Sequence, residues 1–243
     1  RAEVLRRVRY LPASAFRAQY GYNNLMYIAA GEVVGAAGGV SWDNFLEQRI
    51  FRPLGMTRST TRTAVVNTRD NVAVAHTRNE GGIVAMARRN YDNIGGAGAA
   101  WSSAHDMAQW IRLHTSGGTS GGQRLLQEAT LKELHTPQVV IRADTTAERM
   151  FPNTHFRAYG LGWSLQDYHG RKLVHHSGSI NFMRTHVGMI PSERIGVVAI
   201  TNLSSSNLQQ AVLYRVLDAL LGAPARDWSA EYLVQHRLLQ AVL

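Results

Sequence analysis

The chain contains no cysteine, and it has only two lysines, Lys132 and Lys172, among 243 residues. The first absence excludes disulfides, thiolate metal ligands and a cysteine nucleophile. No apolar run approaches the roughly 20 residues that a membrane helix needs. Residues 1–9 are basic, and no apolar stretch follows them. We therefore expect neither a signal peptide at this point nor a membrane span.

Motifs for several other functions are also missing. The sequence has no Gly-x-Ser-x-Gly elbow, no phosphate loop, no dinucleotide fingerprint and no His-Glu-x-x-His pair. The ten histidines are scattered, so we expect no metal site and no cofactor. The net charge is +9, but the basic residues are dispersed. Dispersed charge is typical of a solvated surface, so a nucleic-acid partner is the weakest hypothesis.

The first two thirds of the chain have mainly helical patterns, separated by glycine-rich and polar loops. The spacing of apolar residues predicts helices over residues 23–37, 42–50, 103–115 and 126–135. Residues 57–100 indicate a loop with short extended pieces. Ser103 and Asp106 fit a capping box, in which the serine caps the helix and the acid three residues later reaches back.

From Tyr159 onward the pattern changes to alternation with period two. It predicts four antiparallel strands, over residues 159–168, 172–176, 183–190 and 194–202, followed by helices over 207–221 and 228–243. The glycines after Tyr159 indicate a bend or close backbone packing, and no catalytic role is predicted there. The order of elements predicts an α+β fold, with an antiparallel sheet flanked by helices plus a helical region.

Two short motifs have residue types suited to chemistry. Tyr22 and Asn24 belong to a Tyr-x-Asn triplet at the start of the first long helix. A tyrosine acts as a base only when a nearby cation lowers its pKa. When the triplet is considered alone, packing of the tyrosines and helix capping by the asparagines are the better explanation of Tyr22-Asn23-Asn24.

The second motif is His176-Ser177-Gly178-Ser179, at the end of an apolar run. A strand that ends in small residues lets a ligand approach the backbone. The N–H of Ser179 is suited to an oxyanion hole, and His176 is suited to hydrogen bonding with a hydroxyl. A plain strand end with a surface histidine is the structural alternative.

Together these motifs resemble the serine β-lactamase-related family, which includes class C β-lactamases, D-Ala-D-Ala carboxypeptidases, D-aminopeptidases and esterases. The similarity extends from Phe16 to about Leu221. Besides the two motifs, it rests on five segments: Arg17-Ala18-Gln19-Tyr20-Gly21-Tyr22-Asn23-Asn24-Leu25-Met26-Tyr27, Ile50-Phe51-Arg52-Pro53-Leu54-Gly55-Met56, the stretch 98–110, Tyr159-Gly160-Leu161-Gly162-Trp163 and residues 195–202. The resemblance implies a β-lactamase/transpeptidase-like fold and acyl transfer through an acyl-enzyme.

The resemblance also implies roles for individual residues. Tyr22 would be the general base, Asn24 would bind the acyl side-chain amide, and His176 would take the place of the lysine in Lys-Thr-Gly. Ser177 and Gly178 would line the substrate site, and the Ser179 N–H would complete the oxyanion hole. Histidine in place of lysine is more typical of the esterases and peptidases than of dedicated β-lactamases.

The family's Ser-x-x-Lys nucleophile motif is absent, because Ala129 and His169 precede the two lysines at that spacing. We therefore expect an N-terminally truncated portion of a serine hydrolase, which would be inactive alone. Residues 1–225 would form the C-terminal portion of the hydrolase domain, and 226–243 a linker helix toward a further domain. The N-terminal fragment would be either a separate chain or lost.

The expected partners are a small-molecule or peptide substrate and, in the first of these cases, the N-terminal fragment. A non-catalytic binding or scaffold member of the same fold is the main alternative. The resemblance favours a periplasmic or secreted location, and a cytoplasmic one stays open.

Overall fold

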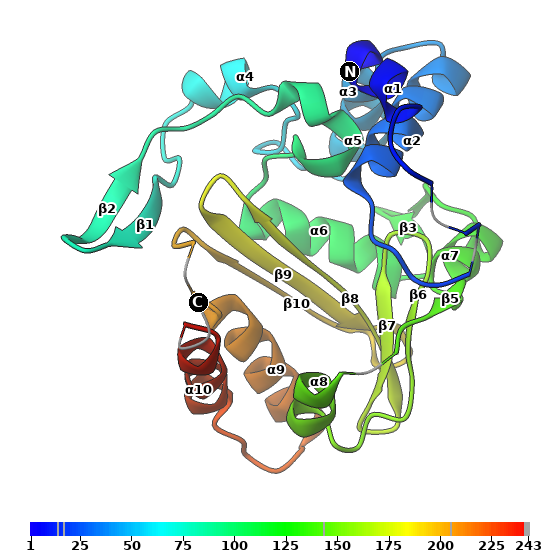
Figure 1. The fold of residues 1–243 in the computed structure, drawn as a ribbon. Helices are drawn as coiled ribbons and strands as arrows, with labels where there is room; N and C mark the ends of the chain where they lie inside the picture. The colour runs from blue at the N-terminus through cyan, green and yellow to red at the C-terminus, as the bar shows by residue number, and fades with distance from the viewer. Residues whose placement is uncertain (14, 17, 143, 205, 241–243) are drawn as a thin grey trace. The chain divides into compact units, whose positions relative to one another are not determined.

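The computed structural model describes residues 1–13, 15–16, 18–142, 144–204 and 206–240. The chain divides into two compact units (Figure 1). Unit 1 consists of Arg1–Ala73 and Ala87–Gln109, and unit 2 of Val74–Met86 and Trp110–Leu243. The boundary falls within helix α6, between Gln109 and Trp110.

Unit 1 is helical. Its elements are α1 (Ala2–Val8), α2 (Asn24–Gly38), α3 (Trp42–Leu46), the π-helical turn η1 (Glu47–Phe51), α4 (Thr63–Asn67), the 3₁₀ turn η2 (Asp92–Ile94), α5 (Gly95–Gly98) and the first half of α6 (Ala104–Thr115). The helix predicted over 42–50 is thus α3 continued by a π-helical turn, which ends just before Pro53.

Helix α2 begins and ends where its sequence provides caps. The side chain of Asn23 accepts a hydrogen bond from the Leu25 N–H at 2.9 Å, and Gly39 ends the helix with a φ of +66°. This left-handed conformation costs glycine little. Glycine also sets the packing of α2 against α5, because a Cβ at Gly96 would lie 2.2 Å from the Tyr27 carbonyl oxygen.

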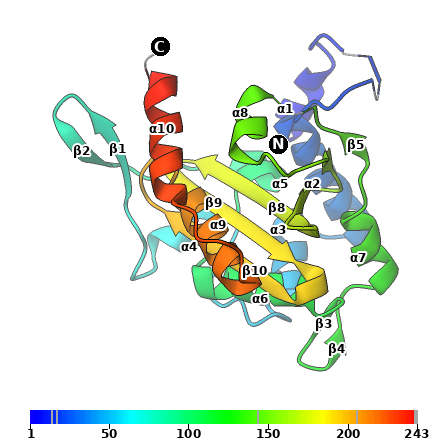
Figure 2. The same cartoon turned by 90° about the horizontal axis from the view of Figure 1, so that it is seen from below.

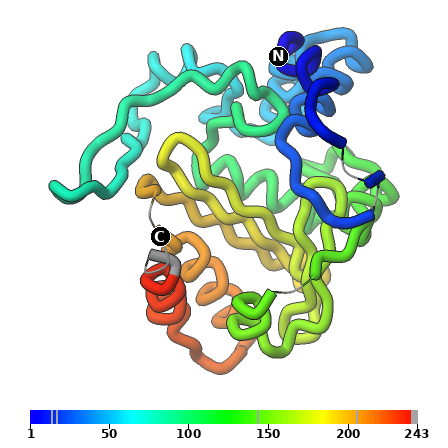
Figure 3. The backbone as a smooth tube through the Cα atoms, viewed as in Figure 1, coloured from blue at the N-terminus to red at the C-terminus, as the bar shows by residue number. Residues whose placement is uncertain are grey.

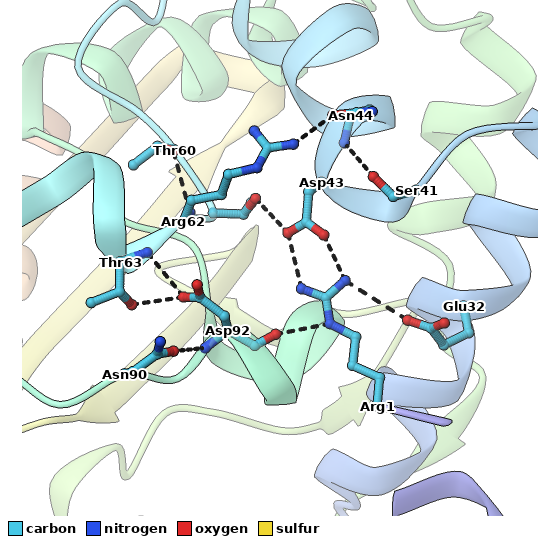
Figure 4. A network of polar contacts seen from close by, with 11 residues as sticks. Arg1, Glu32, Ser41, Asp43, Asn44, Thr60, Arg62, Thr63, Asn90 and Asp92 are labelled. Carbon is cyan, nitrogen blue, oxygen red and sulfur yellow. Dashed lines mark hydrogen bonds and ion pairs between the residues drawn. The ribbon is translucent and has the colours of Figure 1, made fainter. Parts of the chain in front are cut away.

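A polar network fixes the loops of unit 1 around one carboxylate (Figure 4). Asp43 accepts two hydrogen bonds from the Arg1 guanidinium, at 2.7 and 2.9 Å, and one from the Thr61 hydroxyl at 2.7 Å. Arg1 also donates to the Asp92 carbonyl, and the Asp92 carboxylate accepts from the N–H and hydroxyl of Thr63. Segments far apart in the sequence are joined by these contacts.

The capping box predicted at α6 is only half present. The Ser103 hydroxyl accepts from the Asp106 N–H at 3.1 Å, as a cap should. The Asp106 carboxylate does not reach back, because it accepts from the Arg58 N–H and the Ser59 hydroxyl, both at 2.8 Å. A long-range contact has replaced the local one.

Unit 2 is built on a six-stranded antiparallel sheet with the order β10-β9-β8-β7-β6-β5. Figure 3 shows the backbone of this meander from β6 onward. The strands are β5 (Val139–Val140), β6 (Arg157–Tyr159), β7 (Ser164–Tyr168), β8 (Arg171–Ile180), β9 (Met183–Ile190) and β10 (Ile195–Thr201). The predicted antiparallel order of neighbouring strands is confirmed.

The remaining elements of unit 2 surround this sheet or form small hairpins. They are β1 (Ala75–Asn79), β2 (Gly82–Met86), the second half of α6, β3 (Thr119–Ser120), β4 (Gln123–Arg124), α7 (Glu128–Leu134), α8 (Thr145–Met150), η3 (Pro191–Glu193), α9 (Leu208–Leu221) and α10 (Trp228–Gln240). Each of the two short hairpins, β1–β2 and β3–β4, is antiparallel.

The prediction of a single strand over 159–168 is wrong. The chain turns after Tyr159, where the Gly160 N–H donates to the Trp163 carbonyl at 2.8 Å and Gly162 has a φ of +82°. A Cβ at Gly160 would lie 2.5 Å from the Leu134 carbonyl oxygen, so the predicted close packing of this segment is confirmed. The result is two paired strands, β6 and β7.

The two faces of the sheet are covered by different helices. Gly188 of β9 pairs with Val197 of β10, so the next residue of β10, Gly196, points to the opposite face of the sheet. A Cβ atom at Gly188 would meet Leu213 of α9, and a Cβ atom at Gly196 would meet Ile111 of α6. Figures 1 and 2 show α9 and α10 together along the first face. That face holds a core cluster of Met150, Tyr168, Leu173, Ile190, Val197, Ala211, Leu213, Tyr214, Leu217, Trp228 and Tyr232.

The predicted tail helix forms α10 and packs into this core. Trp228 is 2% exposed and Tyr232 is 6% exposed. Residues 241–243 of the predicted helix lie outside the described residues, as does Arg17 of the family resemblance. Whether the segment leads to a further domain stays a prediction.

No single helix in the described part of the chain is long and apolar enough to cross a membrane. One pair, α2 followed by residues 42–51, passes that test by length and composition alone, and it is bent by 74°.

Candidate functional site

Unit 1 places Tyr22 and Asn24 at the start of α2. Asn23 is the capping residue, and Asn24 is the first residue of the helix. Both Tyr22 and Asn24 are exposed, with Tyr22 at 47%. The ring of Tyr22 lies against that of Tyr27, with centroids 5.9 Å apart. The cap thus orients the segment that presents both predicted site residues.

The environment of Tyr22 within unit 1 does not favour a phenolate. Partial burial, and then the neighbouring Tyr27, raise the pKa of Tyr22 above its ordinary value. A general base at neutral pH needs the opposite shift, which a cation close to the phenol would supply. The role of Tyr22 as a base therefore stays a prediction.

Unit 2 places the second motif on β8, which is longer than the sequence predicts. The predicted strand stops at His176, but β8 continues to Ile180 and pairs with β9 along that whole length. Asn181 and Phe182 form the turn, with φ values of +49° and +62°. Two successive positive φ values are typical of the tight turn that matches the twist of a hairpin.

This register decides which backbone groups of β8 face away from β9. In a two-residue hairpin the flanking residues, Ile180 and Met183, hydrogen-bond to each other, and every second residue back from the turn does the same. Ser177 and Ser179 therefore direct their N–H and C=O groups to the other side. In the described sheet β7 pairs with β8 only as far as His175, so this side is a strand edge at Ser177 and Ser179.

His175 and His176 lie on opposite faces of β8, as the alternation of a strand predicts. The His175 Nδ1 is 3.1 Å from the Nε2 of buried His186, on the face that α9 covers. The His176 Nε2 is 3.1 Å from the Tyr159 hydroxyl. The two imidazoles therefore belong to different clusters.

Burial determines the charge of His176. Desolvation lowers its pKa, and a hydrogen bond with the Ser177 backbone acts in the opposite direction. The net shift is downward, so at neutral pH the imidazole is uncharged. A lysine at this position would carry a fixed positive charge, and His176 does not.

Sequence reasoning missed Tyr159. This residue is 8% exposed, and its ring lies edge-on to the imidazole of His176 with centroids 6.1 Å apart. The motif Tyr159-Gly160-Leu161-Gly162-Trp163 was noticed in the sequence, but it was interpreted as part of one continuous strand. Its two glycines were the signal of the turn between β6 and β7 that positions the Tyr159 hydroxyl.

The predicted site residues are thus distributed over both units. Unit 2 brings together His176, Ser177, Gly178 and Ser179 on one strand. Unit 1 brings together Tyr22 and Asn24 at one helix start. Among the residues that the structure describes, no group of three or more histidine, aspartate or glutamate side chains could hold a metal ion.

Residues 1–221 match the family described as Beta-lactamase. The chain belongs to the Beta-lactamase family. Its β-lactamase/transpeptidase-like fold, with an antiparallel sheet and helices, follows from the same match and from structural neighbours.

Among the similar proteins, the unguisins hydrolase ungD of Aspergillus violaceofuscus (strain CBS 115571) is 29% identical over 248 residues, which cover 95% of this chain and 43% of that protein. The octameric penicillin-binding protein homologue from Pyrococcus abyssi superposes with a TM-score of 0.75 at 23% identity, covering 88% of this chain and 45% of its own.

A third similar structure is the D-amino acid amidase from Ochrobactrum anthropi SV3 in complex with L-phenylalanine amide. Its TM-score is 0.65 at 20% identity, covering 88% of this chain and 60% of that chain. The chain therefore spans about half the length of the relatives it matches. The names of these similar proteins are those of a hydrolase, an amidase and a penicillin-binding protein homologue.

Proposed function

We propose that this chain supplies two of the three site elements of a serine hydrolase that works through an acyl-enzyme. The observation that carries the proposal is the β8 edge, where the backbone groups of Ser177 and Ser179 are directed away from β9 and half-buried His176 lies beside them. The match to the Beta-lactamase family supports it. The nucleophile would come from a Ser-x-x-Lys turn outside this sequence.

In the proposed reaction a serine oxygen attacks the carbonyl carbon of an ester or amide. Tyr22, as a phenolate stabilised by the lysine cation of the Ser-x-x-Lys turn, takes the hydroxyl proton. The Ser179 N–H stabilises the negative charge that develops on the carbonyl oxygen. Tyr22 then returns the proton to the leaving alcohol or amine, which departs and leaves an acyl-serine. Water hydrolyses this intermediate by the same proton transfers in reverse.

We propose esters and amides of D-amino acids as substrates, with β-lactams as weaker ones. The uncharged His176 is the reason, because a neutral imidazole offers no fixed charge to a substrate carboxylate. The names of an unguisins hydrolase and a D-amino acid amidase among the similar proteins are consistent with amide cleavage.

The deciding experiment is intact-protein mass spectrometry of the full-length protein after reaction with a fluorophosphonate or a penicillin. We expect one adduct, on a serine outside this sequence. Tyr22→Phe should lower kcat by about 10²–10⁴-fold, the usual contribution of a general base. Tyr20→Phe is the matched control and should retain activity.

The second candidate function is a non-catalytic scaffold of the same fold. It is favoured by the absence of a Ser-x-x-Lys turn from these 243 residues. A full-length protein that forms no adduct and turns over neither esters nor amides would support the scaffold and reject the hydrolase.

A further inference from the structure

A pocket of about 390 Å³ opens on unit 2 between strand β1, the segment that follows β10, and the helices α9 and α10. Its described lining residues run from Arg78 of β1 to Arg237 of α10, and all of them belong to unit 2. Small-molecule sites in proteins have volumes of about 300–1,000 Å³. The pocket is therefore large enough for a small ligand.

Long-range hydrogen bonds hold β1 at this position. The His76 N–H donates to the Asn202 carbonyl at 2.7 Å, and the His76 carbonyl accepts from the Ser204 N–H at 3.0 Å. The Thr77 and Ser204 hydroxyls lie 2.9 Å apart. These bonds fix β1 beside the segment that leads into α9, so the next residue of β1, Arg78, lines the pocket.

The pocket is rich in hydrogen-bond donors. Arg78 and Arg237 each bring a guanidinium, and His236 brings an imidazole. Among the described residues, none of these three side chains has a hydrogen-bond or ion-pair partner. Tyr232 also lines the pocket and is 6% exposed, and its hydroxyl has no hydrogen-bond partner in the part of the chain that the structure describes. A buried phenol usually has such a partner, so a ligand can provide it.

Acceptors are scarce in the same pocket. No aspartate or glutamate is among the described residues that line it. The Asn207 Oδ1 accepts from Arg184 at 3.3 Å, and the Ser206 hydroxyl accepts from the Leu208 N–H at 3.1 Å. Guanidinium groups can only donate, so the ligand has to supply the acceptors. Carboxylate and phosphate oxygens match the fork of a guanidinium.

The rest of the lining is largely apolar. Leu203 precedes α9, Leu208 is its first residue, and Leu233 belongs to α10. Leu208 and Leu233 are 52% and 47% exposed. An alkyl chain that covers these side chains removes apolar surface from water, which favours binding.

We propose that this pocket binds a small amphiphilic anion, in which an alkyl chain carries a carboxylate or phosphate head group. The head group binds among the guanidiniums of Arg78 and Arg237, and the alkyl chain covers Leu208 and Leu233. Binding of this ligand does not require the hydrolase activity proposed above.

The test is isothermal titration calorimetry of the full-length protein with octanoate, octyl phosphate, octanol and acetate. We expect at least one of the two octyl anions to bind, and the tighter one identifies the head group. Octanol lacks the charge and acetate lacks the chain, so each should bind at least about tenfold more weakly. Equal affinities for octanol and the octyl anions would show a merely apolar surface and overturn the proposal. Absence of binding by both anions also overturns it, including the case in which a segment outside this sequence covers the pocket.

Substitutions locate the binding site. Arg78→Gln and Arg237→Gln should each weaken binding of the anion about tenfold, because each removes a charge-assisted hydrogen bond. Both side chains are exposed, so the variants should fold. The matched control is Arg112→Gln, which removes the same charge from an exposed position of α6, the helix on the opposite face of the sheet. It should bind as the wild type does. Equal losses in all three variants, or no loss in the two pocket variants, would reject the pocket as the site.

Discussion

The two units bury different kinds of side chain. The core cluster of unit 2 contains leucines with no exposed surface, such as Leu173, Leu213 and Leu217, together with stacked Tyr214 and Trp228. The buried set of unit 1 includes four hydroxyl side chains and a carboxylate, namely Ser59, Thr60, Thr61, Thr63 and Asp106. Unit 2 buries polar groups as well, but they are mainly imidazoles, amides and one carboxylate beside an apolar cluster, whereas those of unit 1 are mainly hydroxyls that join distant loops.

The largest single effect should come from the one carboxylate that the apolar cluster of unit 2 surrounds. Asp218 is 2% exposed and accepts from the Trp228 Nε1–H at 2.6 Å, from the Tyr168 hydroxyl and from His169. Asp218→Ala leaves two buried donors unsatisfied. We expect a loss of about 3–5 kcal/mol in the free energy of unfolding, measured by urea denaturation.

Asp227→Ala is the control for this substitution, because it removes only an exposed cap of the Ala230 N–H on α10, the helix that begins with Trp228. We expect it to cost about 1 kcal/mol. Equal losses for the two variants would mean that the buried carboxylate stabilises unit 2 no more than a surface cap does.

The second effect is the pH dependence of unit 2, which holds two pairs of buried imidazoles. Burial, followed by the charge of a neighbouring group, lowers the pKa of His114 to about 3 and of His135 and His186 to about 4, and holds the pKa of His175 well below its ordinary value. Their Nδ1···Nε2 distances are both 3.1 Å.

The unfolded chain binds protons at these histidines near pH 6.5, and the folded chain does not until about pH 4. Stability is therefore fully present above pH 6.5 and decreases as the pH falls toward 4. The slope approaches about 1.4 kcal/mol per pH unit for each histidine. Urea midpoints at pH 7.5, 6 and 5 measure it, and His105→Gln, at an exposed position, should leave the slope unchanged.

The sequence was informative where local patterns decide the structure. The alternation along β10 comes from the burial of every second side chain, such as Val197 and Ala199. Asn23 and Ser103 cap their helices with side chains next to the helix start. The carboxylate of Asp106 bonds 48 residues away, to Arg58, so no local pattern could reveal it.

In the candidate site, too, contacts between residues far apart in the sequence could not be predicted from local patterns. The residues of the Tyr22 and His176 motifs were predicted from their sequence and from family resemblance. Tyr159 was not, because its role depends on a contact between β6 and β8 across 17 residues and on the early end of β7. Motifs indicate the residue types of a site, and the strand register decides which of them meet.

The third effect concerns glycine packing in unit 1. Gly96→Ala would place a Cβ 2.2 Å from the Tyr27 carbonyl oxygen, so α2 and α5 must separate. We expect a cost of about 1–3 kcal/mol, as for other overpacked contacts. Gly21→Ala is the control, because no atom lies within 4 Å of its Cβ position. A thermal melt of both variants would show whether unit 1 tolerates that separation.

The smallest effect should come from the Arg1–Asp43 pair in the polar network of unit 1. Burial acts to raise the pKa of Asp43, but the bonds from Arg1 and Thr61 outweigh it and lower that pKa. The stability from this pair is therefore present above the ordinary aspartate pKa and is lost as the pH falls below it. Asp43→Asn should cost about 1–2 kcal/mol in urea denaturation at neutral pH.

Asp70→Asn provides the comparison for that last substitution. Asp70 pairs with Arg58 at 3.1 Å, but its side chain is 92% exposed, whereas that of Asp43 is 15% exposed. Solvent screens the exposed pair, so its loss should not be measurable. Added salt acts on charge pairs by screening, whereas the pH dependence of unit 2 comes from protonation of buried histidines. If Asp43→Asn is also without effect, the loops of unit 1 do not depend on this network, and the contrast between the two units rests on apolar burial alone.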